Sequence, residues 1–494
     1  MRSIITRVAR LLHSPRASFS LFALLMVGTA AVALAPRATG GSGHMPTPLP
    51  VPQPVPVSNQ DASGVTFTGV FSQTKLVQGG NGVVYLDLRI KAPTAAAAVA
   101  PQASDFIVVL DRSGSMAADN RLPYAKEAIR ALLSRLHAED RFALVTFDTT
   151  AAVHTALTPV TNQAREQIMR QVNLLRPGAS TNLSDGLLQA QALLQAPVGE
   201  RRRKVLLLSD GEANAGIVAP RELAKIAASF TQQQAVLSTI GMGLGFNETL
   251  MASLADYGMG HYGYLEHLEK LGDILQHDIH NTRQVFASAS SLEITLGDGV
   301  TVTDVGGYPL DTTTQPGTVR VATGQLLGGA QKQFTVTFAM PTHHLGALAL
   351  GPITLHYTTA QGQAHLALPR EHLQLAVLES TRRDEAVASV DQGLLQKLWA
   401  TNNLGRMQKE VSEWLRAGNK VKAEEAVQEY RQALQAAETA TGVALDSTGV
   451  ADKLSQIEAD VKDAFAGPAA AQPEKRNRAA KSQHREAIKG QRAQ

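Results

Sequence analysis

The spacing of hydrophobic residues changes twice along the chain and divides most of it into three regions. Between residues 104 and 286, runs of consecutive apolar residues alternate with segments that are apolar at every third or fourth position. The runs are typical of strands buried on both faces of a parallel sheet, and the other segments of helices that cover such a sheet. Because the two alternate, we expect a doubly wound, mostly parallel α/β sheet with right-handed crossovers.

The pattern of the α/β region places its strands and helices individually. We expect strands at residues 106–110, 141–147, 204–209 and 236–241, with a weaker edge strand at 152–156. We expect helices at residues 122–136, 161–175, 183–195, 220–230, 247–256 and 268–286. In the first helix Ile129, Leu132 and Leu136 recur at helical spacing, so this face is expected to contact the sheet.

The second region, residues 290–378, is predicted to be all β. Short alternating segments are separated by turn signals such as Gly297-Asp298-Gly299, a pattern typical of a β-sandwich. Residues 64–92 show two similar segments around a glycine-rich turn and predict a β-hairpin. Since an isolated hairpin is only marginally stable, we expect it to join the sandwich, which makes the α/β domain an insertion between sandwich strands.

The third region, residues 381–466, is predicted to be helical. Its first helix has an apolar stripe that includes Val390, Leu394 and Leu398, and Gly418-Asn419 should separate this helix from the next. We expect the stripe to be covered by a two- or three-helix unit or by the sandwich, rather than by a partner helix. Residues 467–494 are strongly basic and predict a disordered, solvated tail, with a contact to an anionic lipid or polymer as the alternative.

The N-terminus predicts export. Four arginines precede the apolar run FSLFALLMVGTAAVALA at residues 19–35, whose length lies between a signal-peptide core and the roughly 20 residues of a spanning helix. Residues 1–36 are therefore a signal peptide or a single membrane anchor, and Pro36 should hinder cleavage after Ala35. Either reading places the rest of the chain in the periplasm or cell envelope, or outside the cell. The proline-rich residues 37–63 predict a semi-rigid linker.

Composition excludes several functions. The 494 residues include 46 Lys and Arg against 43 Asp and Glu, so a near-balanced charge gives no indication of nucleic-acid binding. The chain has no cysteine, which excludes disulfides, thiolate metal sites and a cysteine nucleophile. Glycines 241, 243 and 245 follow a strand, but their spacing differs from the dinucleotide-binding pattern and indicates a close loop.

Side chains that could bind a ligand occur in three loops at the predicted sheet. Asp111, Ser113 and Ser115 come directly after the first strand, Thr181 precedes a helix, and Asp210 ends a later strand. Ligand sites of open α/β sheets lie at the carboxyl ends of the strands. Hydroxyl and carboxylate oxygens are ligands for a hard divalent cation. Taken singly, the first loop is equally compatible with an ordinary Asx turn.

These three motifs together resemble the metal-ion-dependent adhesion site of the von Willebrand factor type A family. The resemblance covers about residues 104–286 and rests on DRSGS at 111–115, TN at 181–182 and SDG at 209–211. It implies that Ser113, Ser115 and Thr181 bind the ion through their hydroxyls. It also implies that Asp111 and Asp210 act directly or through water, and that one coordination position is left for an acidic residue of a partner.

The ligand set indicates which metal and what kind of function to expect. Mg²⁺ suits neutral oxygens, water bridges and one or two carboxylates; Mn²⁺ accepts the same set, and Ca²⁺, which prefers more carboxylates, ranks third. A site with few anions leaves the ion under-neutralised, so a partner's Asp or Glu gains a charge-assisted bond. We therefore expect a metal-ion-dependent protein–protein interaction or adhesion protein of the cell envelope.

Two other functions remain open from the sequence. In the first, the protein is a structural scaffold or assembly factor whose metal only stabilises the three loops. In the second, the metal assists hydrolysis, but the sequence places no general base near the motifs, and we expect no enzymatic activity.

Overall fold

The computed structural model describes most of the chain from residue 54 onward: residues 54, 56–94, 103–195, 201–210, 212–243, 245–265, 284–287, 289–313, 315–359, 361–370, 373–441, 443–445 and 449–492. The predicted signal peptide or anchor at 1–36, most of the linker at 37–63, and the predicted helix at 268–286 up to residue 283 lie outside these residues. Within the described part of the chain, no helix is both long enough and apolar enough to cross a membrane.

The α/β domain is built on a six-stranded sheet with the order β10-β9-β8-β5-β6-β7. Neighbouring strands are parallel except the edge pair β6–β7, which is antiparallel. The strands are β5 (Ser104–Asp111), β6 (Arg141–Phe147), β7 (Ala151–Pro159), β8 (Arg202–Ser209), β9 (Ala235–Met242) and β10 (Met259–Leu265). The sequence pattern predicted five of these strands and did not predict β10.

Helices cover both faces of this sheet, which confirms the doubly wound fold class. One face packs on α3 (Arg121–Arg135) and α4 (Asn162–Leu174), the other on α5 (Leu183–Leu193), α6 (Pro220–Gln232) and α7 (Glu248–Tyr257). Every residue of β5 is buried, which explains its unbroken apolar run. A 3₁₀ segment, η1 (Gly114–Asn120), connects β5 to α3.

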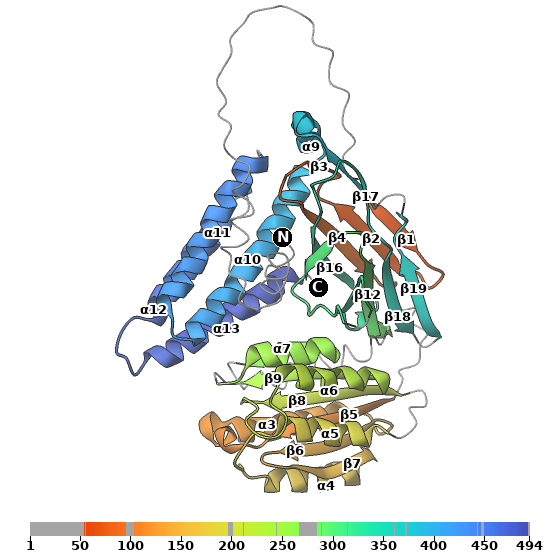
Figure 1. The fold of residues 1–494 in the computed structure, drawn as a ribbon. Helices are drawn as coiled ribbons and strands as arrows, with labels where there is room; N and C mark the ends of the chain where they lie inside the picture. The colour runs from red at the N-terminus through yellow and green to blue at the C-terminus, as the bar shows by residue number, and fades with distance from the viewer. Residues whose placement is uncertain are drawn as a thin grey trace, which may run out of the picture.

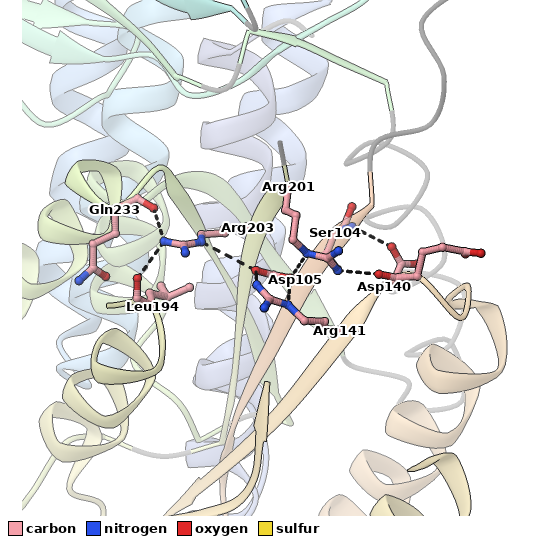
Figure 2. Close-up of polar contacts among 9 residues, drawn as sticks. Ser104, Asp105, Asp140, Arg141, Leu194, Arg201, Arg203 and Gln233 are labelled. Carbon is pink, nitrogen blue, oxygen red and sulfur yellow. Dashed lines mark hydrogen bonds and ion pairs between the residues drawn. The ribbon is translucent and has the colours of Figure 1, made fainter. Parts of the chain in front are cut away.

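The amino ends of the central strands are held by a cluster of charges around Asp105 (Figure 2). The guanidinium group of Arg141 donates to both carboxylate oxygens of Asp105, and Arg201 Nε donates to Oδ1 at 2.6 Å. Arg203 lies 3.8 Å from the same carboxylate and donates to two backbone carbonyls. The cluster joins β5, β6 and β8 at the edge opposite the predicted metal site, so its role is structural.

The β-sandwich is formed by segments from both sides of the α/β domain. β4 (Val83–Lys91) pairs along its whole length with β16 (Gln331–Ala339), and β2 (Thr66–Phe71) pairs with the other edge of β4. Side chains from both segments share one apolar core. The α/β domain therefore interrupts the sandwich in sequence but not in space (Figure 1).

The remaining strands complete the sandwich sheets. They are β1 (Val57–Gln60), β3 (Lys75–Val77), β11 (Val285–Ala287), β12 (Ala289–Thr295), β13 (Thr301–Val305), β14 (Thr318–Ala322), β15 (Leu326–Leu327), β17 (Gly346–Ala349), β18 (Ile353–Thr359), β19 (Gly362–Ala367) and β20 (Gln374–Leu378). β11 occupies the last positions of the helix predicted at 268–286, so that prediction is wrong at its carboxyl end. Val285 and Ala287 are buried at alternate positions and pair with β15.

A helical region packs beside the sandwich (Figure 1). It contains α9 (Arg383–Ala388), α10 (Gln392–Arg416), α11 (Lys420–Thr441), α12 (Val450–Ala464) and α13 (Gln472–Gln491). The Asp391 side chain caps α10 by accepting from the Leu394 backbone N–H at 2.9 Å. Tyr85 of β4 lies in the same apolar core as Trp399 and Tyr430, so one face of β4 is covered by helices and the other by the sandwich.

The prediction of a disordered tail at 467–494 is wrong. Residues 472–491 form α13, in which Ala480 and Ala487 are fully buried. Lys481 Nζ lies 3.2 Å from a carboxylate oxygen of Glu248, and Arg492 pairs with Asp256 at 2.6 Å, both on α7 of the α/β domain. The basic run was interpreted as solvated because its acidic partners lie more than 230 residues away in sequence.

Candidate metal site

The first loop of the site begins at the carboxyl end of β5. Asp111 is fully buried, and its Oδ1 accepts from the Ser113 backbone N–H at 2.7 Å. Its Oδ2 accepts from the Ser209 hydroxyl at 2.6 Å. The sequence reasoning did not identify Ser209, which comes from the neighbouring parallel strand β8 and holds Asp111 in place.

The second aspartate joins this loop through a serine. Ser113 Oγ and Ser115 Oγ lie 3.1 Å apart, and Ser115 Oγ donates to Asp210 Oδ1 at 2.8 Å. Leu110 pairs with Leu208 in the parallel β5–β8 ladder, so the residues that follow each strand end side by side. The structure thus brings four of the five predicted ligands into one hydrogen-bonded group.

The Thr181 loop is tied to both of the other loops by its backbone. The Gly114 N–H donates to the Ala179 carbonyl at 3.0 Å, which joins this loop to the first. The Thr181 N–H donates to Asn214 Oδ1 at 2.8 Å, which joins it to the loop after Asp210. Thr181 itself is buried, with 3% of its surface exposed. The three loops therefore meet at one edge of the sheet.

Close approach of these loops depends on Gly178. Its N–H donates to the Arg112 carbonyl at 2.5 Å, and a Cβ at this position would collide with the carboxylate of Asp148. Asp148 in turn forms an ion pair with Arg112 at 2.7 Å. A residue without a side chain is needed here to bring the Thr181 loop against the first loop.

An arginine that the sequence reasoning missed contributes to the site. Arg121 Nη1 donates to Asp210 Oδ2 at 2.5 Å, and only 12% of the arginine side chain is exposed. Gly243, in the predicted close loop after β9, has φ +77° and lies against this guanidinium. No sequence signal marked Arg121, because it starts an ordinary helix and reaches Asp210 only through the fold.

The electrostatics of the site favour a bound cation. Burial raises the pKa of Asp111 to about 6; hydrogen bonds from Ser209 and Ser113 oppose this shift, and the charge of Asp210 adds to it. Two carboxylates are thus held close together out of water, with one guanidinium on the outer oxygen of Asp210. A divalent cation would offset their repulsion, so the residues present fit such an ion.

The donor set also limits how an ion could be held. Among the described residues, no three His, Cys, Asp or Glu side chains gather in a way that could bind a metal. Of the five predicted ligands only Asp111 and Asp210 carry charge, and the other three are the hydroxyls of Ser113, Ser115 and Thr181. An ion here would depend on neutral oxygens and water for most of its coordination.

Comparison with known proteins identifies the class of domain that carries this site. Residues 106–212 match the von Willebrand factor type A domain family, so the chain contains a domain of this type. The chain is 29% identical over 179 residues to the uncharacterised protein YfbK of Escherichia coli and 26% identical over 193 residues to the uncharacterised protein sll0103 of Synechocystis. These matches span 31% and 43% of the two relatives, and 36% and 39% of this chain.

Two solved structures resemble the molecule beyond this domain. A von Willebrand factor type A protein from Catenulispora acidiphila aligns over 88% of this chain and 98% of its own, with a TM-score of 0.63 and 17% identity. The ArnB paralog VWA2 from Sulfolobus acidocaldarius aligns over 86% of this chain and 99% of its own, with a TM-score of 0.52 and 16% identity. These likenesses show a shared fold that includes the sandwich and helical regions.

Proposed function

We propose that this protein is a non-enzymatic binding protein whose von Willebrand factor type A domain presents a divalent cation to a partner. Mg²⁺ is the expected ion, and Mn²⁺ or Ca²⁺ could replace it. The observation that carries the proposal is the convergence of three loops. In these loops the Ser115 hydroxyl donates a hydrogen bond to Asp210, and the Gly114 N–H donates one to the Ala179 carbonyl. Asp111, Ser113, Ser115, Thr181 and Asp210 would hold the ion. Domains of this type typically mediate binding between proteins.

The charge balance of the site supports an acidic partner. Asp111 and Asp210 are the only carboxylates among the predicted ligands, and Asp210 already shares its charge with Arg121. An ion held this way keeps unsatisfied positive charge at the edge of the sheet. An Asp or Glu side chain of a partner protein would complete the coordination and gain a charge-assisted bond.

The other parts of the chain support a location in the cell envelope. The apolar run at residues 19–35 would export the protein or anchor it by a single span, and the proline-rich linker would hold the folded part away from the membrane. The sandwich and helical regions would then position the α/β domain for its partner.

One observation favours the scaffold alternative. The loops of the site are connected to one another by protein hydrogen bonds, such as that from the Thr181 N–H to Asn214. In a scaffold, the metal would only add stability to these loops, and the helical region near the C-terminus would bind the partner.

A capture experiment separates the two functions. The wild-type protein and Asp111→Ala would be used to capture envelope proteins in Mg²⁺ and in EDTA, with Glu166→Ala, an exposed carboxylate of the same domain, as the control. We expect a partner that the wild type and the control retain in Mg²⁺ only, and that Asp111→Ala does not retain. Retention by Asp111→Ala or in EDTA would favour the scaffold.

The hydrolytic alternative has its own test. Turnover of phosphoester or peptide substrates by the wild type, lost in Asp210→Ala, would show that the metal serves catalysis. We expect no turnover.

A further inference from the structure

We propose that a cavity at the junction of the three regions is a binding site for a small molecule carrying two or more phosphate groups. The cavity has a volume of about 510 Å³. Its walls come from β10 of the α/β domain, from sandwich residues such as Tyr308 and Lys332, and from the carboxyl half of α13. The site is separate from the metal site, and the proposal does not depend on the function proposed above.

The lining of the cavity is strongly cationic. Among the described residues that line it, Lys332, Arg485, Lys489 and Arg492 are cations and Asp256 is the single carboxylate. These side chains carry a formal excess of three positive charges. Three of the four cations belong to the basic run that the sequence reasoning interpreted as a solvated tail, and the fold instead directs them to one cavity.

Asp256 does not neutralise the other cations, because Arg492 occupies it. The two Nη atoms of Arg492 donate to the two carboxylate oxygens at 2.6 and 2.8 Å. The same guanidinium donates to the Gly306 and Gly307 carbonyls and lies 3.7 Å over the Tyr308 ring. Arg492 is therefore a fixed part of the cavity wall, and its pair with Asp256 is close to neutral.

Lys332 is a buried cation of the cavity lining that a bound anion could contact. Its ammonium donates to the Thr323 carbonyl, and the described carboxylate that acts on it electrostatically, Asp256, is already paired with Arg492. An ammonium has three donors, so two remain for a bound anion. Burial and the nearby charge of Arg492 lower the pKa of Lys332 to about 8. A phosphate bound beside it would stabilise the charged form and relieve this repulsion.

Arg485 and Lys489 both line the cavity and are exposed to solvent, so we assign them to its mouth, where they can hold an entering anion. The Arg485 side chain is 57% exposed, and it lies 3.7 Å from the carboxylate of Glu486, which is itself exposed. Lys489 is one helical turn further along and is also exposed. Because an arginine presents a planar pair of donors, it suits two phosphate oxygens at once.

The volume and the charge together indicate the class of ligand. The cavity lies within the range of about 300–1,000 Å³ that is common for small-molecule sites. A single phosphate would leave part of the positive charge uncompensated, whereas a diphosphate group can contact Lys332 and a mouth residue together. The rings of Tyr262 and Tyr264 add apolar wall for an organic group attached to the phosphates.

Titration calorimetry on the full chain tests this proposal. Pyrophosphate, inorganic phosphate, ADP and adenosine would be titrated in EDTA, so that no metal at the other site can bind them. We expect pyrophosphate and ADP to bind and adenosine not to bind. The affinity for inorganic phosphate should be lower than that for pyrophosphate by about tenfold or more. Affinity should fall with added salt, because the mouth cations are exposed.

Charge-removing variants locate the binding. Arg485→Gln with Lys489→Gln should weaken pyrophosphate binding by about tenfold or more, since charge-assisted hydrogen bonds are lost. The matched control is Lys453→Gln with Lys462→Gln, which removes two exposed cations from α12 and should leave affinity unchanged. Lys332→Gln should abolish binding, with circular dichroism to show that the variant is folded.

Three results would overturn the proposal. The first is that pyrophosphate does not bind at millimolar concentration. The second is that the mouth variant and its control lose equal amounts of affinity for pyrophosphate, and the third is that adenosine binds as tightly as ADP. If Lys332→Gln failed to fold, the mouth variant and its control would still decide between a site in this cavity and nonspecific attraction to the basic helix.

Discussion

At the residue scale, the main feature of the predicted metal site is that its two buried carboxylates carry more negative charge than the nearby cations offset. Asp111 and Asp210 are both buried and close together, and among the described residues Arg121 is the only cation that forms an ion pair with either of them. Hydrogen bonds from Ser209 and Ser115 hold the carboxylates in place without neutralising them. The predicted ion would therefore change the electrostatics of this edge of the sheet far more than its geometry.

Removing a predicted ligand should weaken metal binding without unfolding the domain. We expect Asp111→Ala and Thr181→Ala each to lower Mg²⁺ or Mn²⁺ affinity by about 10–100-fold. The far-ultraviolet circular dichroism spectrum should stay nearly unchanged. Titration calorimetry measures the affinity, and Glu166→Ala serves as the unaffected control. If either variant unfolded, that residue would be structural instead.

The substitution Arg121→Gln should make the thermal stability of the protein depend more strongly on bound Mg²⁺. The Asp210 side chain is fully buried, so losing its ion pair should lower the free energy of unfolding of the metal-free protein by about 3 kcal/mol. Mg²⁺ would supply the missing positive charge, so it should raise the Tm of the variant more than that of the wild type.

Calorimetry with and without Mg²⁺ measures both effects. Arg130→Gln, on the exposed face of the same helix, is the control and should behave as the wild type. Equal Mg²⁺-induced shifts in Arg121→Gln and the wild type would mean that the ion and the guanidinium do not share Asp210.

At the scale of single elements, α13 shows how a polar helix can be part of a core. Lys481 of α13 pairs with Glu248 of α7 and lies 3.3 Å from the Phe246 ring centre, and Arg492, directly after α13, pairs with Asp256 of α7. His484 is buried on the same helix, with its ring 6.4 Å from that of Tyr262. The helix thus joins the helical region to the α/β domain through charges and rings rather than through an apolar stripe.

His484 should make this contact sensitive to acid. Burial, with the positive charges of Lys409, Arg416, Arg492 and Lys481, lowers its pKa to about 3 in the folded protein, against about 6.5 when unfolded. Below pH 6.5 the unfolded chain binds a proton that the folded one does not. This histidine therefore makes stability fall as pH falls from 6.5 towards 3, by about 1.4 kcal/mol per pH unit.

Urea unfolding of the wild type and His484→Gln between pH 5 and 7.5 tests this dependence. The variant should lose less stability on acidification. Asp111, whose pKa is raised to about 6, acts in the opposite direction, but it is present in both proteins and cancels in the comparison. Parallel pH profiles would show that His484 binds its proton as readily in the folded protein as in the unfolded chain, so that its pKa is not lowered.

At the scale of the whole molecule, the α/β domain is an insertion into a sandwich that needs both flanking segments. Val84, Leu86, Leu88 and Ile90 of β4 are fully buried in the sandwich core, and β4 lies between β2 and β16. The sandwich can therefore complete its core only with residues that precede the α/β domain.

A fragment of residues 290–378 should not fold by itself. Without the hairpin at 64–92, β16 loses its partner along nine residue pairs and the core loses one wall. We expect a sigmoidal urea transition when the hairpin is joined to the fragment, and a gradual one without it. A fragment that unfolds as cooperatively alone as with the hairpin would contradict this interdependence.

The sequence by itself determined the order of the elements and the candidate ligands. Apolar runs such as that of β5 predict a buried parallel strand because burial on both faces leaves no polar position, and the residues after such strands indicate a site at the sheet edge. These signals are local, since they depend on the period of side chains along one segment.

Only the tertiary structure decided what lies far apart in the chain. Three such features have no signature in the local sequence. They are the contact of Arg121 with Asp210, the place of β10 at the sheet edge, and the pairing of α13 with α7. A lysine or arginine looks the same in sequence whether it faces water or a carboxylate more than 230 residues away. The free energy of such a contact depends on where the fold places its partner.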